Sequence, residues 1–364
     1  MAVYADTRFS NRRRNLASTL AAQRLDGLVV THLTHVLFLS GFTGDNAAML
    51  VNKDQSVNLA TDSRFTTQIA EEVPDIEAII ARNCAEELLS RLTGPKRIGY
   101  EATYVTMAEL DKLQAAVGDD ITLVPVTGLI EDIRLIKDPA SLEYLEQVAA
   151  ISVTAWNELV EAEEIAVGMT EREVAAALEY RMRVLGSDRV SFDTIVASGA
   201  NSAKPHHTAS DKVIDDGDIV TVDFGAFARG FNSDMTRTVI AGHTTKFSRE
   251  IYDIVLRAQQ AGIEAAIPGT PVREVDKVCR DIITEAGYGD YFIHSTGHGV
   301  GLDVHEAPYA STRGEGELAP GMTLTVEPGI YIPGKGGVRI EDTVIIRSGK
   351  PHIITDARKE LTVV

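Results

Sequence analysis

STGHGVGLDVHEAP, residues 295–308, is the stretch around which the rest of the chain is organised. It sets two histidines, His298 and His305, among glycines, and this leaves both imidazoles free for chemistry. We interpret it together with acidic residues in the second half of the chain, which stand inside apolar, strand-like segments.

Four carboxylates are the relevant acids. They are Asp223 in VTVDFGAF, Asp234 in FNSDMTRT, and Glu327 and Glu341 in TVEPGIYIPGKGGVRIEDTV. Asp223 and Glu327 interrupt apolar runs where a core residue is expected, so a surface position suits them least. Unpaired buried carboxylates are very costly. Two divalent cations would balance the four negative charges, with one neutral histidine as a further ligand.

The spacing of these acids predicts how strands present them. Asp223 and Asp234 are eleven residues apart, so a tight turn near Ala228 and Arg229 would place them directly opposite in an antiparallel pair. Gly230 leaves room for a one-residue bulge in that turn. Glu327 and Glu341 are fourteen apart around a turn rich in glycine and proline, residues 333–337, and we expect the same arrangement.

A site of carboxylates with one imidazole and no thiolate suits harder divalent ions, with Mn²⁺ or Co²⁺ favoured over a structural zinc. Two such ions can activate a water near neutral pH and polarise a substrate carbonyl. Hydrolysis is therefore the expected class of reaction.

Composition narrows the other possibilities. The chain has 364 residues, 44% hydrophobic, enough for two domains with their own cores. Its net charge of −18 argues against nucleic acid or an anionic membrane as partner. The first residues lack a signal-peptide pattern and no apolar run approaches the roughly 20 residues of a membrane span, so a cytoplasmic location is expected. Cys84 and Cys279 fall in different predicted domains, which predicts two buried thiols.

The first part of the chain reads as a small α/β domain with a mixed sheet, residues 1–130. Residues 7–24 have the pattern of an amphipathic helix, and residues 26–42 read as strand material ending near Gly41. Short strands and helices then alternate. His32 and His35 are interpreted as satisfied histidines because no acidic cluster accompanies them.

The second domain, residues 131–364, shows one pattern twice. Asp138 caps a long helix that begins at Pro139 and is expected to break at Gly168; Thr170 and Glu173 form a capping box for the next. Strands follow at 218–227 and 234–242. Helices are then expected from Ser248 to Gly269 and from Thr270 to Gly287, followed by strands at 322–332 and 338–346. Two halves facing each other across a pseudo-twofold would bring the carboxylates together.

Taken as a whole, the chain resembles the Xaa-Pro peptidase family with the pita-bread fold, which includes prolidase and aminopeptidase P. The resemblance covers essentially the full length, including a creatinase-like N-terminal α/β domain. It implies that the motifs VDFG, SDMTR, TGHG, VEPG and RIED supply the metal ligands, here Asp223, Asp234, His298, Glu327 and Glu341. It also implies two metal ions, with Mn²⁺ expected and Co²⁺ or Zn²⁺ as alternatives, a proline-containing di- or oligopeptide as substrate, and a homodimer.

The resemblance implies roles for further residues. His206 in AKPHHTASD, which directly follows Pro205, and His305 in VHEAP match two histidines that line the family's substrate site. Either could stabilise the oxyanion formed when the carbonyl is attacked. Glu327 is the expected proton shuttle, and it would deliver a proton to the proline nitrogen. Arg339 resembles a family arginine near the metal network, and it is expected, with Tyr309, to be among the substrate-binding residues.

One position departs from the family. Some dipeptidases have an arginine where this chain has Tyr309, and Arg313 could take over its role toward a C-terminal carboxylate. Both dipeptidase and aminopeptidase P activity therefore stay open. The alternatives are a creatinase-like hydrolase that needs no metal and a non-catalytic binding protein on the same fold. All five ligand positions are kept, which argues against both.

Overall fold

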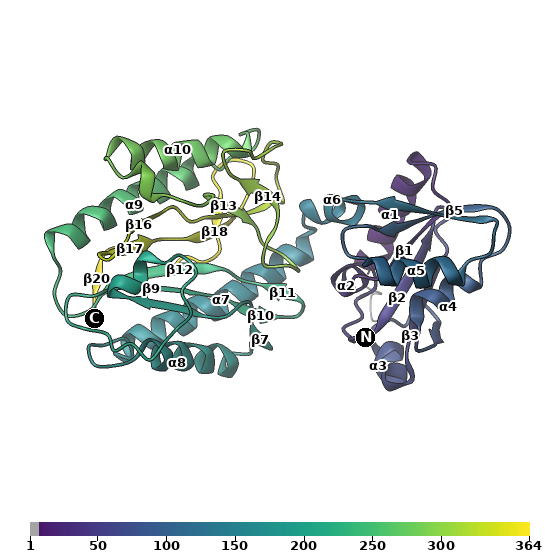
Figure 1. Ribbon diagram of the computed structural model, residues 1–364, viewed down its shortest axis with the longest axis horizontal. Helices are drawn as coiled ribbons and strands as arrows, with labels where there is room; N and C mark the ends of the chain where they lie inside the picture. Colours follow the sequence, from purple (N-terminus) through teal and green to yellow (C-terminus); the bar gives the residue numbers. More distant parts are fainter. Residues whose placement is uncertain (1–6) are drawn as a thin grey trace. The chain divides into compact units, whose positions relative to one another are not determined.

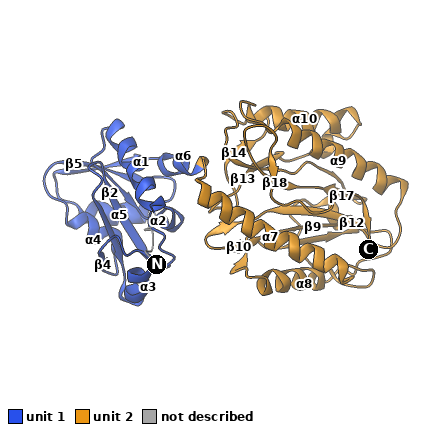
Figure 2. Ribbon diagram, turned by 180° about the vertical axis from the view of Figure 1, so that it is seen from behind, with its two compact units in different colours: residues 1–134 blue, residues 135–364 orange. Residues whose placement is uncertain are grey.

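The structure is a computed structural model that describes residues 7–364, so part of the N-terminal sequence considered for a signal peptide lies outside the described residues. The chain divides into two compact units, the first ending at Arg134 and the second running from Leu135 to Val364 (Figure 2). Within residues 7–364, none of the helices is both long and apolar enough to cross a membrane.

The first unit is built on a six-stranded mixed sheet, as expected, with strand order β4-β3-β2-β1-β5-β6. Its strands are β1 Gly27–Val30, β2 Ala47–Asn52, β3 Val57–Thr61, β4 Ala78–Ile80, β5 Lys96–Glu101 and β6 Ile121–Val126. Its helices are α1 Arg8–Ala22, α2 Leu33–Ser40, α3 Thr66–Glu72, α4 Cys84–Ser90, α5 Met107–Ala116 and α6 Leu129–Leu135, which crosses into the second unit. A short 3₁₀ helix spans Ser63–Phe65.

The prediction of continuous strand material up to Gly41 is wrong. Strand β1 ends at Val30, and helix α2 follows until Gly41, whose φ of 85° closes it in the left-handed conformation. An apolar run buried on several sides does not reveal its period, so a short helix reads like a strand. His35 on α2 is buried, and its Nδ1 lies 2.5 Å from Glu101 Oε1, whereas its buried Nε2 has no hydrogen-bond partner among the described residues, so the prediction of a satisfied histidine holds for one ring nitrogen alone.

Four helices of the second unit follow the expected order. They are α7 Pro139–Glu161, α8 Glu171–Val184, α9 Lys246–Ala265 and α10 Val272–Glu285. Asp138 caps α7 by accepting from Ser141 N, and the capping box of Thr170 and Glu173 opens α8. Several bounds differ from the prediction. Helix α7 ends at Glu161, well before Gly168. Helix α9 is capped by Thr245, so that Ser248 is its third residue, and it ends at Ala265, before Gly269; α10 begins at Val272.

Two interrupted β-hairpins form the centre of the second unit. In the first, β9 Ile219–Phe224 pairs with β12 Met235–Ile240, and β10 Ala226–Ala228 pairs with β11 Phe231–Asn232. In the second, β15 Thr323–Val326 pairs with β18 Asp342–Ile345, and β16 Gly329–Ile332 pairs with β17 Gly336–Arg339. Each hairpin leaves regular pairing for one or two residues between its two ladders, and the four predicted acidic ligands lie at these breaks or beside them.

The helices cover the two hairpins separately. Side chains of α7 and α8 form a core with the first hairpin, in which Trp156 stacks on Phe224 at 5.8 Å between ring centroids. Side chains of α9 and α10 form a second core with the second hairpin. Figure 1 shows the two helix pairs on opposite sides of the strands. The repeated pattern of two helices and a strand pair is thereby confirmed.

Shorter elements complete the second unit. They are β7 Arg189–Val190, β8 Ile195–Ser198, β13 Gly297–Gly299, β14 Glu306–Ala310, β19 His352–Ile353 and β20 Thr362–Val363, with 3₁₀ helices at Gly199–Ala203 and Gly289–Tyr291. Strand β8 pairs with β9, and β13 pairs with β14. These two pairings bring the histidine-bearing segments to the hairpins.

Candidate active site

The predicted metal ligands gather in one cluster within the second unit. Ligand atoms of Asp223, Asp234 and Glu341 lie within 4.8 Å of one another, as do those of His298, Glu327 and Glu341. Ligand atoms of Asp234, His298 and His305 form a third such group. Residues from four separate segments therefore meet at one point, and His305 is near enough to take part.

The first hairpin presents its two acids diagonally. Thr236, not Asp234, is the partner of Asp223, so the prediction that the two acids lie directly opposite is wrong. The reason is the turn, which falls on Arg229 and Gly230 with φ of 55° and 83°, one residue later than predicted. Two-residue hairpin turns of this kind require positive φ at both positions. Because Asp234 precedes Thr236 by two residues, it keeps the same face as Asp223.

The second hairpin presents its acids face to face. Val326 pairs with Asp342 on one side of the break, and Gly329 pairs with Arg339 on the other. The register is the same in both ladders, so Glu327 and Glu341 fall opposite each other across the break, as expected.

His298 is oriented for a metal. Its Nδ1 lies 3.0 Å from the carbonyl oxygen of Gly299, an acceptor, so Nδ1 carries the proton. Its Nε2 lies 3.4 Å from Glu327 Oε1 and 3.6 Å from Asp234 Oδ2. A backbone partner on one ring nitrogen is the usual way in which the other nitrogen is aimed at a metal.

The glycine before His298 permits a close approach. A Cβ on Gly297 would lie 1.8 Å from the carbonyl oxygen of Thr325, so β13 can lie this close to β15 only with glycine there. The Oγ1 of Thr325 accepts from His298 N at 2.9 Å and fixes the histidine relative to β15.

Burial disfavours the ionised form of three of the four acids in the cluster. Burial raises the pKa of Asp234 well above its usual range, and the carboxylates of Glu341, Asp223 and Glu327 raise it further. Burial, Glu327 and Asp223 do the same for the pKa of Glu341. Burial also raises the pKa of Asp223, although Arg339 opposes the rise. The cluster therefore needs positive charge at its centre.

Glu327 behaves differently from the other acids. Burial by itself would raise its pKa, but the hydrogen bond and charge of His298 outweigh burial and lower the pKa to about 2.

Among the described residues, the buried Asp223 Oδ1 has no hydrogen-bond partner, whereas Oδ2 accepts from Arg339 Nη2 at 2.7 Å. An unpartnered carboxylate oxygen facing other carboxylates fits a divalent cation.

A cavity of about 530 Å³ opens onto this cluster. The predicted substrate residues His206, His305, Arg339 and Tyr309 all line it. Tyr309 is the β14 partner of His298 and is 51% exposed. Arg313 is exposed and is not among the described residues that line the cavity.

Arg339 lines the cavity but is committed to protein partners. Besides Asp223, it donates through Nη1 to Tyr331 Oη at 2.8 Å and through Nε to Thr236 Oγ1 at 3.1 Å. Its side chain is 3% exposed. The guanidinium therefore holds Asp223 in place.

Two residues of this network were not predicted from the sequence. His294 Nδ1 lies 2.8 Å from Ser295 O and Nε2 lies 2.8 Å from Tyr331 Oη, so the tyrosine donates to His294 and accepts from Arg339. Burial raises the pKa of Tyr331 to about 12 and lowers that of His294. His294 stands four residues before His298 in FIHSTGHG, which was the available signal; Tyr331 gave none.

Comparisons with known proteins give matches to both parts of the chain. Residues 143–348 match the model of metallopeptidase family M24, and residues 12–136 match the creatinase/prolidase N-terminal domain. An Xaa-Pro dipeptidase of Pyrococcus furiosus is 38% identical over 352 residues, which are 96% of this chain and 99% of that protein.

Two solved structures are also similar along their full length. The Xaa-Pro dipeptidase from Bacillus anthracis has a TM-score of 0.93 and 38% identity, with 98% of this chain and 100% of that chain covered. The X-Pro aminopeptidase from Thermotoga maritima has a TM-score of 0.88 and 35% identity, with 97% and 99% covered.

Proposed function

The chain belongs to metallopeptidase family M24, and from this we propose that it is a metal-dependent hydrolase that cuts the Xaa-Pro bond at the N-terminus of dipeptides or short peptides. The observation that carries the proposal is the convergence of four carboxylates and one imidazole on the floor of a cavity. The raised pKa values of Asp234 and Glu341 support a requirement for cations there.

Five residues would hold two divalent ions: Asp223, Asp234, His298, Glu327 and Glu341. Mn²⁺ is the proposed metal, with Co²⁺ and Zn²⁺ as alternatives, because oxygen ligands predominate. When bound, such a pair supplies an activated water and polarises the substrate carbonyl. The chain supplies the charge balance and fixes the ligands through Arg339 and the Gly299 carbonyl.

The remaining roles follow from the bond that is cut. An Xaa-Pro amide has no N–H, so a subsite that grips this proton would be useless. Attack on the carbonyl develops negative charge on oxygen, and we assign its stabilisation to His305 and His206, two of the histidines that line the cavity. Glu327 accepts a proton from water and passes it to the proline nitrogen.

Selectivity for dipeptides would need a cation for the substrate's C-terminal carboxylate. Among the described residues lining the cavity, Arg339 is the one arginine or lysine, and its Nε, Nη1 and Nη2 each donate to a protein partner. Tyr309 stands where a family arginine would be. We therefore propose that peptides longer than two residues are accepted as well. A homodimer and a cytoplasmic location remain predictions.

The test combines metal analysis with peptide cleavage. Protein stripped with EDTA should cut neither Ala-Pro nor Ala-Pro-Ala, and Mn²⁺ should restore cleavage of both, with Ala-Ala as the control peptide. Cleavage that survives complete removal of metal would favour a creatinase-like hydrolase. Peptide binding without cleavage by the metal-loaded protein would favour the binding protein.

A further inference from the structure

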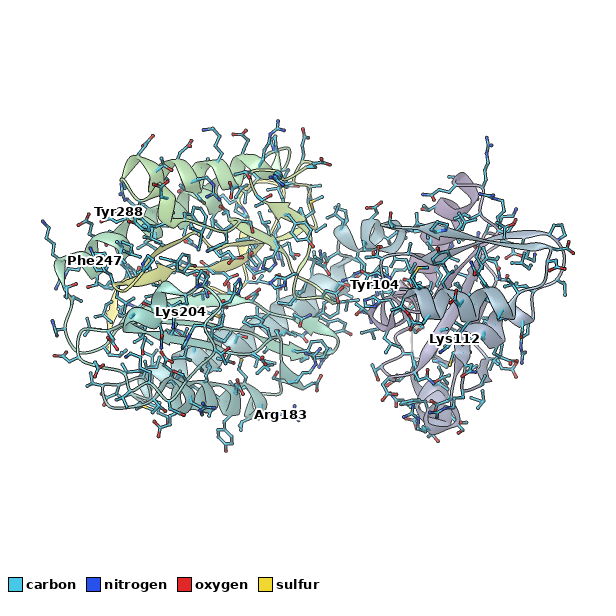
Figure 3. The ribbon with its side chains drawn as sticks, viewed as in Figure 1. Tyr104, Lys112, Arg183, Lys204, Phe247 and Tyr288 are labelled. Carbon is cyan, nitrogen blue, oxygen red and sulfur yellow. The ribbon has the colours of Figure 1, made fainter. Side chains whose placement is uncertain are left out.

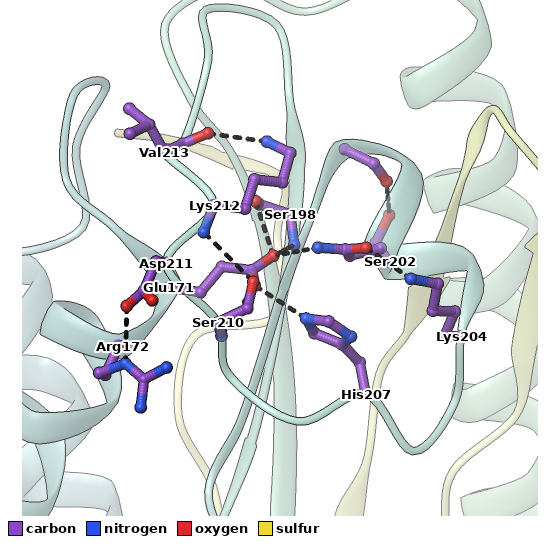
Figure 4. Close-up of polar contacts among 12 residues, drawn as sticks. Glu171, Arg172, Ser198, Ser202, Lys204, His207, Ser210, Asp211, Lys212 and Val213 are labelled. Carbon is purple, nitrogen blue, oxygen red and sulfur yellow. Dashed lines mark hydrogen bonds and ion pairs between the residues drawn. The ribbon is translucent and has the colours of Figure 1, made fainter.

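Glu171, the first residue of α8, is fully buried outside the metal cluster and is surrounded by hydrogen-bond donors (Figure 4). Its Oε1 accepts from Ser198 N at 2.8 Å, Ser198 Oγ at 2.9 Å and Asn201 Nδ2 at 3.0 Å. Its Oε2 accepts from His207 Nε2 at 2.8 Å, Ser210 N at 3.1 Å and Ser210 Oγ at 2.5 Å.

All six donors belong to one segment, residues 198–210, called here the His206 loop. The Oε1 partners come from the start of the loop, where β8 ends and the 3₁₀ helix Gly199–Ala203 follows, and the Oε2 partners come from its end. One carboxylate therefore ties both ends of the loop together. His206 lies between the two sets of contacts, and it is exposed in the cavity.

The loop is also anchored to the second hairpin. Ser202 Oγ accepts from Gly337 N at 2.9 Å, and Gly337 belongs to β17, the strand that carries Arg339. Lys204, which Figure 3 labels, donates to Asn201 Oδ1 at 2.7 Å within the loop (Figure 4). The start of the loop is thus fixed twice, by Ser202 and by Glu171. After His206, the ring of His207 and both donors of Ser210 bond to Glu171, and Ser210 O accepts from Arg172 N of the same helix at 3.1 Å.

The Glu171 carboxylate is ionised. Burial opposes ionisation, but the hydrogen bonds from Ser210, Asn201, His207 and Ser198 outweigh it and lower the pKa to about 2. An ionised carboxylate only accepts, so His207 Nε2 carries its proton. The position at the start of α8 favours the negative charge further, because the helix dipole is positive there.

We propose that Glu171 is the positioning residue for His206: it closes the loop and so fixes the imidazole of His206 over the metal cluster. The inference rests on the proposed function, in which His206 stabilises the oxyanion. The contacts of Glu171 with the loop are called here the anchor. His207, the neighbouring histidine, is part of the anchor, because its Nε2 donates to Glu171 Oε2.

The substitution Glu171→Gln is well suited to the test. Glutamine keeps the shape of the side chain but turns one acceptor oxygen into a donor amide. Backbone N–H groups of Ser198 and Ser210 face the two oxygens, and neither N–H can become an acceptor. In either orientation, the amide N–H₂ group therefore faces a backbone N–H, and one end of the loop loses its hydrogen bond to residue 171.

Measurements of kcat distinguish a positioning role of Glu171 from a general loss of protein stability. Glu171→Gln should lower kcat on Ala-Pro by roughly tenfold to a hundredfold, the scale of a small misplacement of a reacting group. In a His206→Ala background the same substitution should change kcat by less than about twofold, because groups that act as a unit are not additive. An equal fold-loss in both backgrounds would overturn the proposal.

Matched variants complete the design. Glu173→Gln, which alters the capping box of the same helix but contacts Thr170 alone among the described hydrogen-bond partners, should leave kcat unchanged. Ser210→Ala removes one donor and should give a smaller kcat loss of the same kind if Glu171→Gln fails to fold.

Hydrogen exchange tests the anchor without activity. Amides of residues 199–210 should exchange faster in Glu171→Gln than in Glu173→Gln, with metal content equal in both. Unchanged exchange would refute the anchor. A wild-type protein that cuts no Xaa-Pro peptide would refute the proposed function while leaving the exchange result to decide the anchor.

Discussion

Ionisation of Asp234 is disfavoured, because burial and three neighbouring carboxylates all raise its pKa. Asp234→Asn keeps the shape of the side chain but removes its charge. We expect loss of at least one metal ion per protein and of nearly all activity. Metal analysis by mass spectrometry and kcat on Ala-Pro check this. Asp193→Asn, an exposed acid lining the same cavity, should retain both ions; full metal in Asp234→Asn would disprove the ligand assignment.

His305 allows the roles of ligand and oxyanion donor to be told apart. It lies within ligand distance of Asp234 and His298, yet also faces the cavity. As an oxyanion donor, His305→Ala should lower kcat by roughly 10² or more with metal content unchanged. If the variant loses a metal ion instead, His305 is a ligand.

The sequence predicted the cluster because its motifs place carboxylate and imidazole side chains at strand ends, where a few residues identify both the strand and the ligand. It did not show how the ligands are held: the family resemblance pointed to Arg339 but not to its bond with Asp223, and nothing pointed to Glu171. Arg339 reaches Asp223 across 116 residues of chain, and Glu171 reaches Ser210 across 39. Such partners share no local pattern, so only the tertiary structure pairs them. The sequence likewise could not assign different roles to His206 and His207, because the difference lies in the hydrogen bond that His207 makes to Glu171.

Among the elements, those with local signals were predicted best. The capping box of Thr170 and Glu173 and the Asp138 cap act within one turn of helix, so sequence shows them directly. Helix α2 was missed because it is apolar on several sides. The turn of the first hairpin was predicted one residue too early, on Ala228 and Arg229. In the structure it falls on Arg229 and Gly230, both with positive φ, which glycine adopts readily and arginine rarely does.

Strand β13 gives a test of close packing. Gly297→Ala would drive a Cβ into the Thr325 carbonyl at 1.8 Å, so β13 must move and take His298 with it. We expect a loss of stability of roughly 1–3 kcal/mol, typical of overpacking, together with weaker metal binding. Chemical denaturation and metal titration measure both. Gly118→Ala, with nothing within 4 Å of the added Cβ, should change neither; wild-type behaviour of Gly297→Ala would contradict the close approach.

For the molecule as a whole, the two units have separate cores with one cysteine in each. Cys84 belongs to the core of the first unit and Cys279 to a core of the second, and both thiols are buried. Burial raises the pKa of Cys84 to about 11 and that of Cys279 to about 12. At pH 8 the thiolate fraction is therefore about one in a thousand or less, and labelling requires opening of the surrounding core.

Thiol labelling should consequently report each unit by itself. Metal binds only to the native second unit, and metal at 100 times its Kd stabilises it by about 2.7 kcal/mol, equivalent to a roughly hundredfold slower opening to unfolded chain. With Mn²⁺ present, we expect Cys279 to react with iodoacetamide about a hundredfold more slowly than in stripped protein, while Cys84 keeps its rate. Peptide mass spectrometry follows both sites in one sample, so Cys84 is an internal control. Equal slowing at both cysteines would mean that the units open together, and no slowing at Cys279 would place the metal outside the second unit.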